Sequence, residues 1–191
     1  MIEAELKARV HDPERVRARL AARAAEEVSV YRDTYYDLPD RSLSNGDREL
    51  RVRIIERGDT RRCLLTYKDA RVDAASGSKP EHETDIGEAT TNDAILRALG
   101  YEPVIAFTKH CANFAFEAQG QRVQATLVRV PELAGTFLEI ETLIGNRGEV
   151  GAALDVIRRI LGDLGITEAE LTTKLYTDMV AEHRRTVAPP G

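Results

Sequence analysis

Hydrophobic and polar side chains alternate with a period of two along several segments of this chain. The first such segment, IEAELKARV at 2–10, alternates apolar residues with charged ones, so that Glu3, Glu5 and Lys7 share one face. Because successive side chains of a strand point to opposite faces, this alternation predicts a β-strand with one charged face. Similar segments, many of them rich in β-branched and aromatic residues, predict further strands at 28–38, 48–57, 62–70, 80–86, 101–119, 121–130 and 136–144.

Helical signals are interspersed among these strands and follow them. Asp12 is a favourable N-cap with Pro13 at the first helical position, and Val16 and Leu20 form an apolar stripe four residues apart. Other predicted features are helices at 89–99, 148–163 and 167–184, a hairpin turn at Gly58-Asp59 and a mobile loop at 71–79. The order predicts an α+β protein with a largely antiparallel sheet of roughly eight strands, able to close into a β-barrel with flanking helices.

Length and composition narrow the class of protein. The 191 residues suffice for a single domain, which we expect at 1–184, followed by a flexible tail at 185–191. The formal net charge of −5, without a basic tail, argues against nucleic acid as a partner. Apolar runs are too short for a membrane span and the start of the chain lacks signal-peptide features, so we expect a soluble, cytoplasmic protein that binds no membrane. Cys63 and Cys111 are too few for a disulfide framework.

The charged residues of the predicted strands are sorted by sign. Acidic pairs two residues apart occur on three segments: Glu3 with Glu5, Glu81 with Glu83, and Glu139 with Glu141. Basic residues occupy three other segments: Arg51, Arg53, Lys68 and Lys109. An ordinary solvent face mixes the signs, because like charges placed side by side repel. The sorting favours a charged interior, but the period of two leaves a solvated outer face open as the other interpretation.

Paired carboxylates and clustered cations have complementary ligands. Carboxylate oxygens are hard ligands that suit Mg²⁺ or Mn²⁺. Lysine and arginine side chains that face one space favour an anion, phosphate above all. Together, the two sets describe a site for a metal ion and a polyphosphate.

Seven motifs follow one another along the chain: EAELK, DTYYD, LRVR, LTYK, KPEHE, FTK and GTFLEIE. In this order they resemble the motifs of the CYTH superfamily, the triphosphate tunnel metalloenzymes, which usually has Arg-x-Glu-x-Glu at the place of KPEHE. A lone Glu-x-Glu-x-Lys is a weak signal, whereas seven elements in order on successive strands are a strong one. The family includes class IV adenylate cyclases, thiamine triphosphatases and inorganic triphosphatases. The resemblance implies an antiparallel barrel of about eight strands around a charged tunnel.

The resemblance also implies roles for individual residues. The expected ligands of Mg²⁺ or Mn²⁺ are Glu3, Glu5, Glu139 and Glu141. The expected phosphate contacts are Lys7, Arg51, Arg53, Lys68 and Lys109. Within these sets, catalytic roles are expected for Glu5, Lys7 and Lys68. Two roles stay open for Glu81 and Glu83: to complete the charge network or to bind a second metal ion. The expected partner is a phosphorylated small molecule, and a homodimer is compatible with such a barrel.

Two positions depart from the family pattern. Cys111 stands where the family commonly has the Arg of Lys-x-Arg, and Val128 stands at the Asp of Leu-Asp-x-Val. The first change removes a basic contact and the second a carboxylate. We interpret Cys111 as an inert strand residue rather than a nucleophile. We also interpret Lys174, Tyr176 and Asp178 as a polar helix face rather than a cap of the tunnel.

The leading hypothesis is a divalent-metal-dependent enzyme that hydrolyses an inorganic, nucleoside or thiamine triphosphate inside the barrel. The two departures make hydrolysis the preferred reaction over conversion of ATP to cyclic AMP and pyrophosphate. An enzyme acting on an organic diphosphate and a catalytically silent polyphosphate- or nucleotide-binding module are further alternatives. All of them predict metal-sensitive anion binding, so affinity alone does not separate them.

Overall fold

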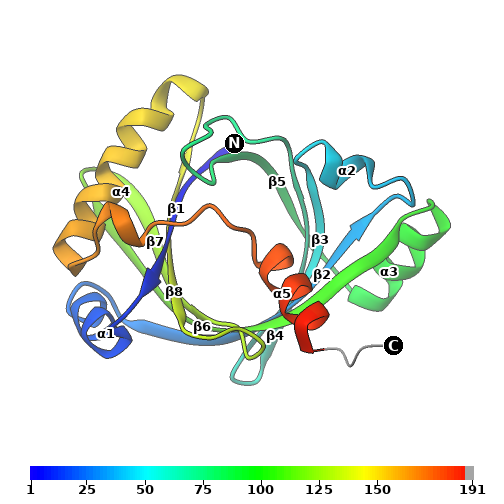
Figure 1. Ribbon diagram of the computed structural model, residues 1–191, viewed down its shortest axis with the longest axis horizontal. Coiled ribbons are helices and arrows are strands. Elements are labelled where there is room, and N and C mark those ends of the chain that lie inside the picture. The colour runs from blue at the N-terminus through cyan, green and yellow to red at the C-terminus, as the bar shows by residue number, and fades with distance from the viewer. Residues whose placement is uncertain (188–191) are drawn as a thin grey trace.

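Eight strands close into an antiparallel barrel in the computed structural model, which describes residues 1–187 (Figure 1). Their bounds are β1 Ile2–Val10, β2 Glu26–Asp37, β3 Glu49–Arg57, β4 Thr60–Lys68, β5 Lys79–Ile86, β6 Glu102–Ala118, β7 Gln121–Arg129 and β8 Thr136–Ile144. Around the barrel they follow the order β1-β5-β4-β3-β2-β6-β7-β8, and β8 pairs with β1 to close it. The predicted α+β fold with an eight-stranded barrel is confirmed.

The helices lie outside the barrel wall except the last one, which lies at the barrel opening (Figure 1). They are α1 Pro13–Ala21, α2 Ser42–Asn45, α3 Ala89–Ala98, α4 Val150–Leu164 and α5 Tyr176–Val187, with 3-10 turns η1 Arg147–Glu149 and η2 Glu168–Glu170. As predicted, the Asp12 side chain accepts from the backbone N–H of Arg15 at the start of α1, and Gly58-Asp59 joins β3 to β4. Among residues 1–187, no helix has the length and apolar character that crossing a bilayer requires.

The outer face of β1 explains why its charged face lies inside. Ala4, Leu6 and Ala8 are almost fully buried and belong to a core cluster with α1, α4 and the outward side chains of β7 and β8. Removing this apolar surface from water stabilises the fold by roughly 25 cal/mol per Å². Since side chains of a strand alternate, covering the apolar face with helices turns Glu3 and Glu5 toward the barrel axis.

The chain after α4 differs from the predicted helix at 167–184. Residues 171–175 are not helical, because this segment pairs with β1: Leu171 bridges Ala8, and the backbone N–H of Thr172 donates to the carbonyl of Lys7 at 2.8 Å. In Figure 1 the segment crosses the opening of the barrel before α5 begins at Tyr176. Residues 185–187, expected in the tail, continue α5, and 188–191 lie outside the described residues.

Candidate functional site

The inward faces of the strands line one cavity. In the β1–β8 ladder Glu5 is the direct partner of Glu141 and Lys7 that of Glu139, so these four side chains share a face. All the site residues predicted from the sequence lie on the cavity wall: Glu3, Glu5, Lys7, Arg51, Arg53, Lys68, Glu81, Glu83, Lys109, Glu139 and Glu141. Charges taken from six strands thus face a single space, whereas their individual roles remain predictions.

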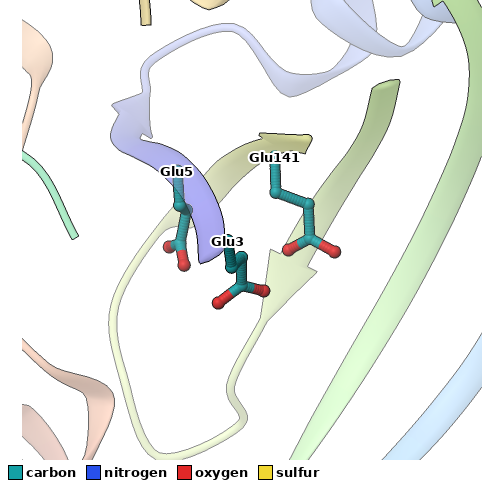
Figure 2. A group of neighbouring side chains, drawn as sticks. All are labelled: Glu3, Glu5 and Glu141. Carbon is teal, nitrogen blue, oxygen red and sulfur yellow. The ribbon is translucent and has the colours of Figure 1, made fainter. Parts of the chain in front are cut away.

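Three carboxylates meet on the β1–β8 side of the cavity (Figure 2). Glu3, Glu5 and Glu141 each offer an oxygen atom, and these atoms lie within 4.8 Å of one another. Burial, together with the neighbouring carboxylates Glu139 and Glu3, raises the pKa of Glu5 to about 7. Burial and the carboxylates of Glu3 and Glu5 likewise raise the pKa of Glu141 well above its ordinary value. Ionising all three carboxyl groups of the cluster at once is therefore unfavourable when no cation is bound.

This donor set fits a divalent cation. Buried Glu3 and half-buried Glu5 and Glu141 supply hard oxygen ligands. Burial and mutual repulsion raise the pKa values of Glu5 and Glu141, and a bound cation would offset both effects. Glu139, the fourth predicted ligand, is not in this group. It lies instead with its Oε2 atom 3.8 Å from the Nζ atom of Lys109.

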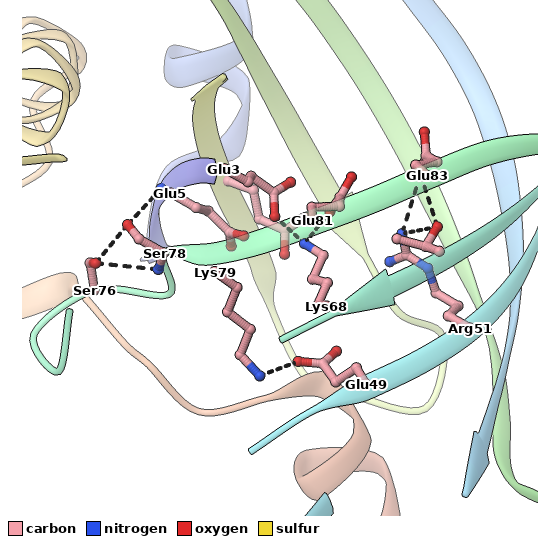
Figure 3. Close-up of polar contacts among 12 residues, drawn as sticks. Glu3, Glu5, Glu49, Arg51, Lys68, Ser76, Ser78, Lys79, Glu81 and Glu83 are labelled. Atoms are coloured by element: carbon pink, nitrogen blue, oxygen red, sulfur yellow. Dashed lines mark hydrogen bonds and ion pairs between the residues drawn. The ribbon is translucent and has the colours of Figure 1, made fainter. Parts of the chain in front are cut away.

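Lys68 links the acidic cluster to β5 (Figure 3). Its ammonium group contacts the Glu3 carboxylate and lies 2.9 Å from Oε2 of Glu81, its partner residue in the β4–β5 ladder. Although burial alone would raise the pKa of Glu3, the Lys68 ammonium lowers it to about 2. Glu83 lies farther along β5, at 3.9 Å from Arg51, and is one-third exposed. The contact with Lys68 favours a part in the charge network for Glu81.

Arg53 is held by Asp33, which was not predicted from the sequence as a site residue. Its Nε and Nη2 atoms donate to the two carboxylate oxygens of Asp33 at 2.6 and 2.7 Å, and its guanidinium lies 4.6 Å from the centre of the Tyr31 ring. The Asp33 side chain is completely buried. Asp33 lies within the motif DTYYD and is the direct partner of Arg53 in the β2–β3 ladder, a register that the sequence alone does not give.

Arg51 makes fewer hydrogen bonds than Arg53. Its Nη2 atom donates to the hydroxyl of Thr66 at 3.3 Å, and its buried Nε atom has no hydrogen-bond partner among residues 1–187. A buried guanidinium donor without a partner is costly. Arg51 therefore has donor capacity left for an anion in the cavity.

Lys7 and Lys109 approach the same aromatic ring. Their Nζ atoms lie 4.6 and 4.1 Å from the ring centre of Tyr176, the first residue of α5. Tyr176 is only 5% exposed and lines the cavity, so its interpretation as part of a polar outer helix face was wrong. Asp178 is exposed on α5 as that interpretation expects, whereas Lys174 is exposed but precedes the helix.

The loop at 71–79 lies against one end of the cavity. Ser76 and Ser78 are fully buried, and the Oγ atom of Ser78 accepts from the backbone N–H of Glu5 at 3.3 Å. Lys79 donates to the carboxylate of Glu49 at 2.8 Å (Figure 3). These cavity-wall contacts were not predicted, because the small residues of this loop carry no periodic pattern.

The two departures from the family pattern face each other. Cys111 and Val128 are direct partners in the β6–β7 ladder and are 3% and 0% exposed. Both belong to an apolar cluster that includes Phe137 and Tyr176. Burial raises the pKa of the Cys111 thiol to about 12, which makes it a poor nucleophile at neutral pH. Compared with the Arg and Asp that the resemblance implies, Cys111 lacks one positive charge and Val128 lacks one negative charge. Because the two residues are paired, the net charge at this position of the barrel is the same.

The raised pKa of Glu5 predicts a stability that falls with pH in metal-free protein. Between pH 4.5 and about 7 the unfolded chain has lost the Glu5 proton while the folded chain keeps it, so stability decreases as the pH rises through this window. The contribution is at most roughly 3 kcal/mol. Thermal unfolding in a chelator at pH 5 and pH 8 measures it. Glu5→Gln should show a smaller decrease, and an identical decrease in both proteins would contradict the prediction.

The chain is similar over most of its length to known proteins. A family model described as CYTH domain matches residues 1–176. A Methanocaldococcus jannaschii protein named “putative adenylate cyclase” is 26% identical over 181 residues, which cover 94% of this chain and 98% of that protein. A solved structure from Pyrococcus horikoshii has a TM-score of 0.84 and 27% identity, and the match covers 95% of this chain and 99% of that one.

A more distant solved structure comes from Hippeastrum. It has a TM-score of 0.64 and 16% identity, and the match covers 95% of this chain and 96% of that one. It is described as a “putative adenylyl cyclase” that reveals a dominant triphosphatase activity. At this identity the likeness shows a shared fold.

Proposed function

This chain belongs to the CYTH domain family, and from that premise we propose that it is a divalent-metal-dependent enzyme that hydrolyses a triphosphate inside its barrel. The observation that carries the proposal is the arrangement of charge. The cluster of Glu3, Glu5 and Glu141 lies on one side of a cavity whose other walls present Arg51, Lys68 and Lys109. A polyphosphate bridged to the carboxylates by a cation satisfies both sets.

In this proposal, the chain's own residues bind and orient the phosphate groups. The buried Nε atom of Arg51 has no hydrogen-bond partner among residues 1–187. Lys7 on β1 and Lys109 on β6 present their ammonium groups to the cavity beside Tyr176. A Mg²⁺ or Mn²⁺ ion held by Glu3, Glu5 and Glu141 would polarise a phosphate oxygen or a water molecule. Phosphoryl transfer depends mainly on such positioning and charge neutralisation, so no nucleophilic side chain is required.

Hydrolysis is preferred to cyclisation because Cys111 and Val128 stand where the resemblance implies an Arg and an Asp. Cyclisation requires the enzyme to direct a ribose hydroxyl to the α-phosphorus, and an apolar pair offers that hydroxyl neither charge nor a strong hydrogen bond. Conversion of ATP to cyclic AMP and pyrophosphate remains the second candidate, since the M. jannaschii relative is named for that activity. The products separate the two reactions.

The proposal is tested by measuring the release of phosphate, pyrophosphate and cyclic AMP. Inorganic triphosphate, ATP and thiamine triphosphate are each supplied with Mg²⁺, with Mn²⁺ or with a chelator. We expect metal-dependent phosphate release that falls to background in Glu5→Gln protein purified in the same way. Pyrophosphate with cyclic AMP would establish the second candidate. If no substrate is turned over while triphosphate still raises the melting temperature, the protein is a binding module and the enzymatic proposal fails.

A further inference from the structure

Tyr176 occupies a position that neither the resemblance nor the comparisons assign. It begins α5 directly after the segment that crosses the barrel opening (Figure 1). Its ring packs edge-on against Phe137, with the ring centres 5.3 Å apart, and lies 6.4 Å from that of Phe107. These contacts fix the ring as a wall of the cavity.

The Tyr176 ring brings together two cations that the proposed function uses. Lys7 and Lys109 place their ammonium groups 4.6 and 4.1 Å from its centre. Lys109 also has Glu139 at 3.8 Å, whereas no hydrogen bond or ion pair within residues 1–187 involves the ammonium group of Lys7. Lys7 is nevertheless 8% exposed. Its ladder partner Glu139 and the neighbouring Glu5 act on it electrostatically, but neither forms a close ion pair with it. The three donor hydrogens of Lys7 therefore remain available to an anion that binds beside Tyr176.

The Tyr176 hydroxyl is an independent second observation. Its oxygen atom is buried and makes no hydrogen bond of ordinary geometry in the described part of the chain. Burial, together with the nearby Glu139 carboxylate, raises the pKa of this hydroxyl well above its ordinary value, so Glu139 is the acceptor nearest to hand when no ligand is bound. Buried tyrosine hydroxyls usually find a partner, because an unsatisfied polar group loses the hydrogen bonds it made in water. Here the hydroxyl lies on the wall of the same cavity as Lys7 and Lys109.

We propose that Tyr176 is part of the phosphate-binding wall, where its ring positions the ammonium groups of Lys7 and Lys109 and its hydroxyl donates a hydrogen bond to a phosphate oxygen bound between them. This inference rests on the proposed function and adds a neutral donor from α5 to the charged residues of the strands. It also assigns a role to the non-helical segment 171–175, because the pairing of Leu171 and Thr172 with β1 places Tyr176 at the cavity.

The test compares two substitutions that separate the hydroxyl from the ring. Tyr176→Phe removes only the hydroxyl, and Tyr176→Leu also removes the ring that positions the lysines. Tyr36→Phe is the matched control, because Tyr36 is equally buried but donates its hydroxyl to Asp93 outside the cavity. Binding of inorganic triphosphate is measured by calorimetry in a chelator, so that no turnover occurs. Initial rates with Mg²⁺ and melting temperatures are measured for the same proteins.

We expect Tyr176→Phe to weaken triphosphate binding about tenfold and to raise KM by a similar factor, with kcat changed less than about threefold. Tyr176→Leu should weaken binding about a hundredfold, and Tyr36→Phe should leave binding and KM unchanged. If native protein binds triphosphate and Tyr176→Phe binds it equally well, the inference is overturned while the proposed function stands. A loss of affinity that only follows the melting temperature also overturns it. If native protein hydrolyses triphosphate with Mg²⁺ but does not bind it in the chelator, the KM values decide, and an unchanged KM in Tyr176→Phe overturns the inference. If native protein neither binds triphosphate nor hydrolyses it with Mg²⁺, both fail.

Discussion

Replacing Arg53 by leucine should lower the free energy of unfolding by about 3–5 kcal/mol. The substitution leaves the Asp33 carboxylate buried without its bidentate partner, which donates at 2.6 and 2.7 Å. With Arg53 in place, the pKa of Asp33 lies well below its ordinary value although burial opposes this, so the folded protein holds the carboxylate ionised. Removing the cation makes that ionised state costly. Urea unfolding followed by circular dichroism measures the difference.

Arg57 on the same strand supplies the control. It pairs with Glu27 at 2.6 Å, but both side chains are about half exposed, so Arg57→Leu should cost less than about 1 kcal/mol. Equal losses for the two arginines would contradict the prediction. The double variant Asp33→Val with Arg53→Leu should recover most of the stability, because a buried ion pair replaced by apolar residues leaves no unpaired charge. That variant then tests whether Arg53 also contacts phosphate, without the loss of stability.

Two signals in the sequence predict most of the barrel: alternation at all eight strands and sorting of the charges on six of them. Alternation gives the strands, and sorting of the charges indicates that one face is not ordinary solvent surface. Alternation alone does not show which face of a strand points into the barrel and which points outward. On β1 the structure supplies it: Ala4, Leu6 and Ala8 are covered by α4 and its neighbours, which leaves Glu3 and Glu5 inside. The helices that cover the apolar face therefore decide where the charges lie.

Parts of the site that depend on non-periodic segments could not be predicted. Tyr176 enters the cavity because Leu171 and Thr172 pair with β1 and residues 171–175 form no helix. This pairing includes a hydrogen bond from the backbone N–H of Thr172 to the carbonyl of Lys7. Ser76 and Ser78 are buried by a loop whose composition suggests exposure. The relation between Cys111 and Val128 needed the β6–β7 register, which a single sequence does not give. Long-range register and loop placement, rather than residue type, were the missing information.

Glu141→Gln should stabilise the metal-free protein while it abolishes the response to metal. Burial and the carboxylates of Glu3 and Glu5 hold the pKa of Glu141 well above its ordinary value, so at neutral pH the folded state is destabilised relative to the unfolded chain, where this carboxyl ionises freely. Glutamine resembles the neutral form and removes that cost. The free energy of unfolding in a chelator should therefore rise by about 1–3 kcal/mol. The same change removes an oxygen ligand of the proposed cation.

Glu141→Gln should raise stability in the chelator and lower the stabilisation by metal. This combination distinguishes a metal ligand from a buried acid that only supports the fold. In native protein a cation at one hundred times its dissociation constant adds about 2.7 kcal/mol of stability, and Glu141→Gln should lose most of that gain. The metal-dependent kcat/KM should fall about a hundredfold or more, or ~2.7 kcal/mol of transition-state stabilisation. Glu102→Gln, on an exposed position of β6, should change neither quantity. A variant that is destabilised in the chelator yet still stabilised by Mg²⁺ would show that Glu141 supports the fold rather than the cation. Opposite signs in one variant would mean that the barrel gives up stability at β1 and β8 in order to bind its metal ion.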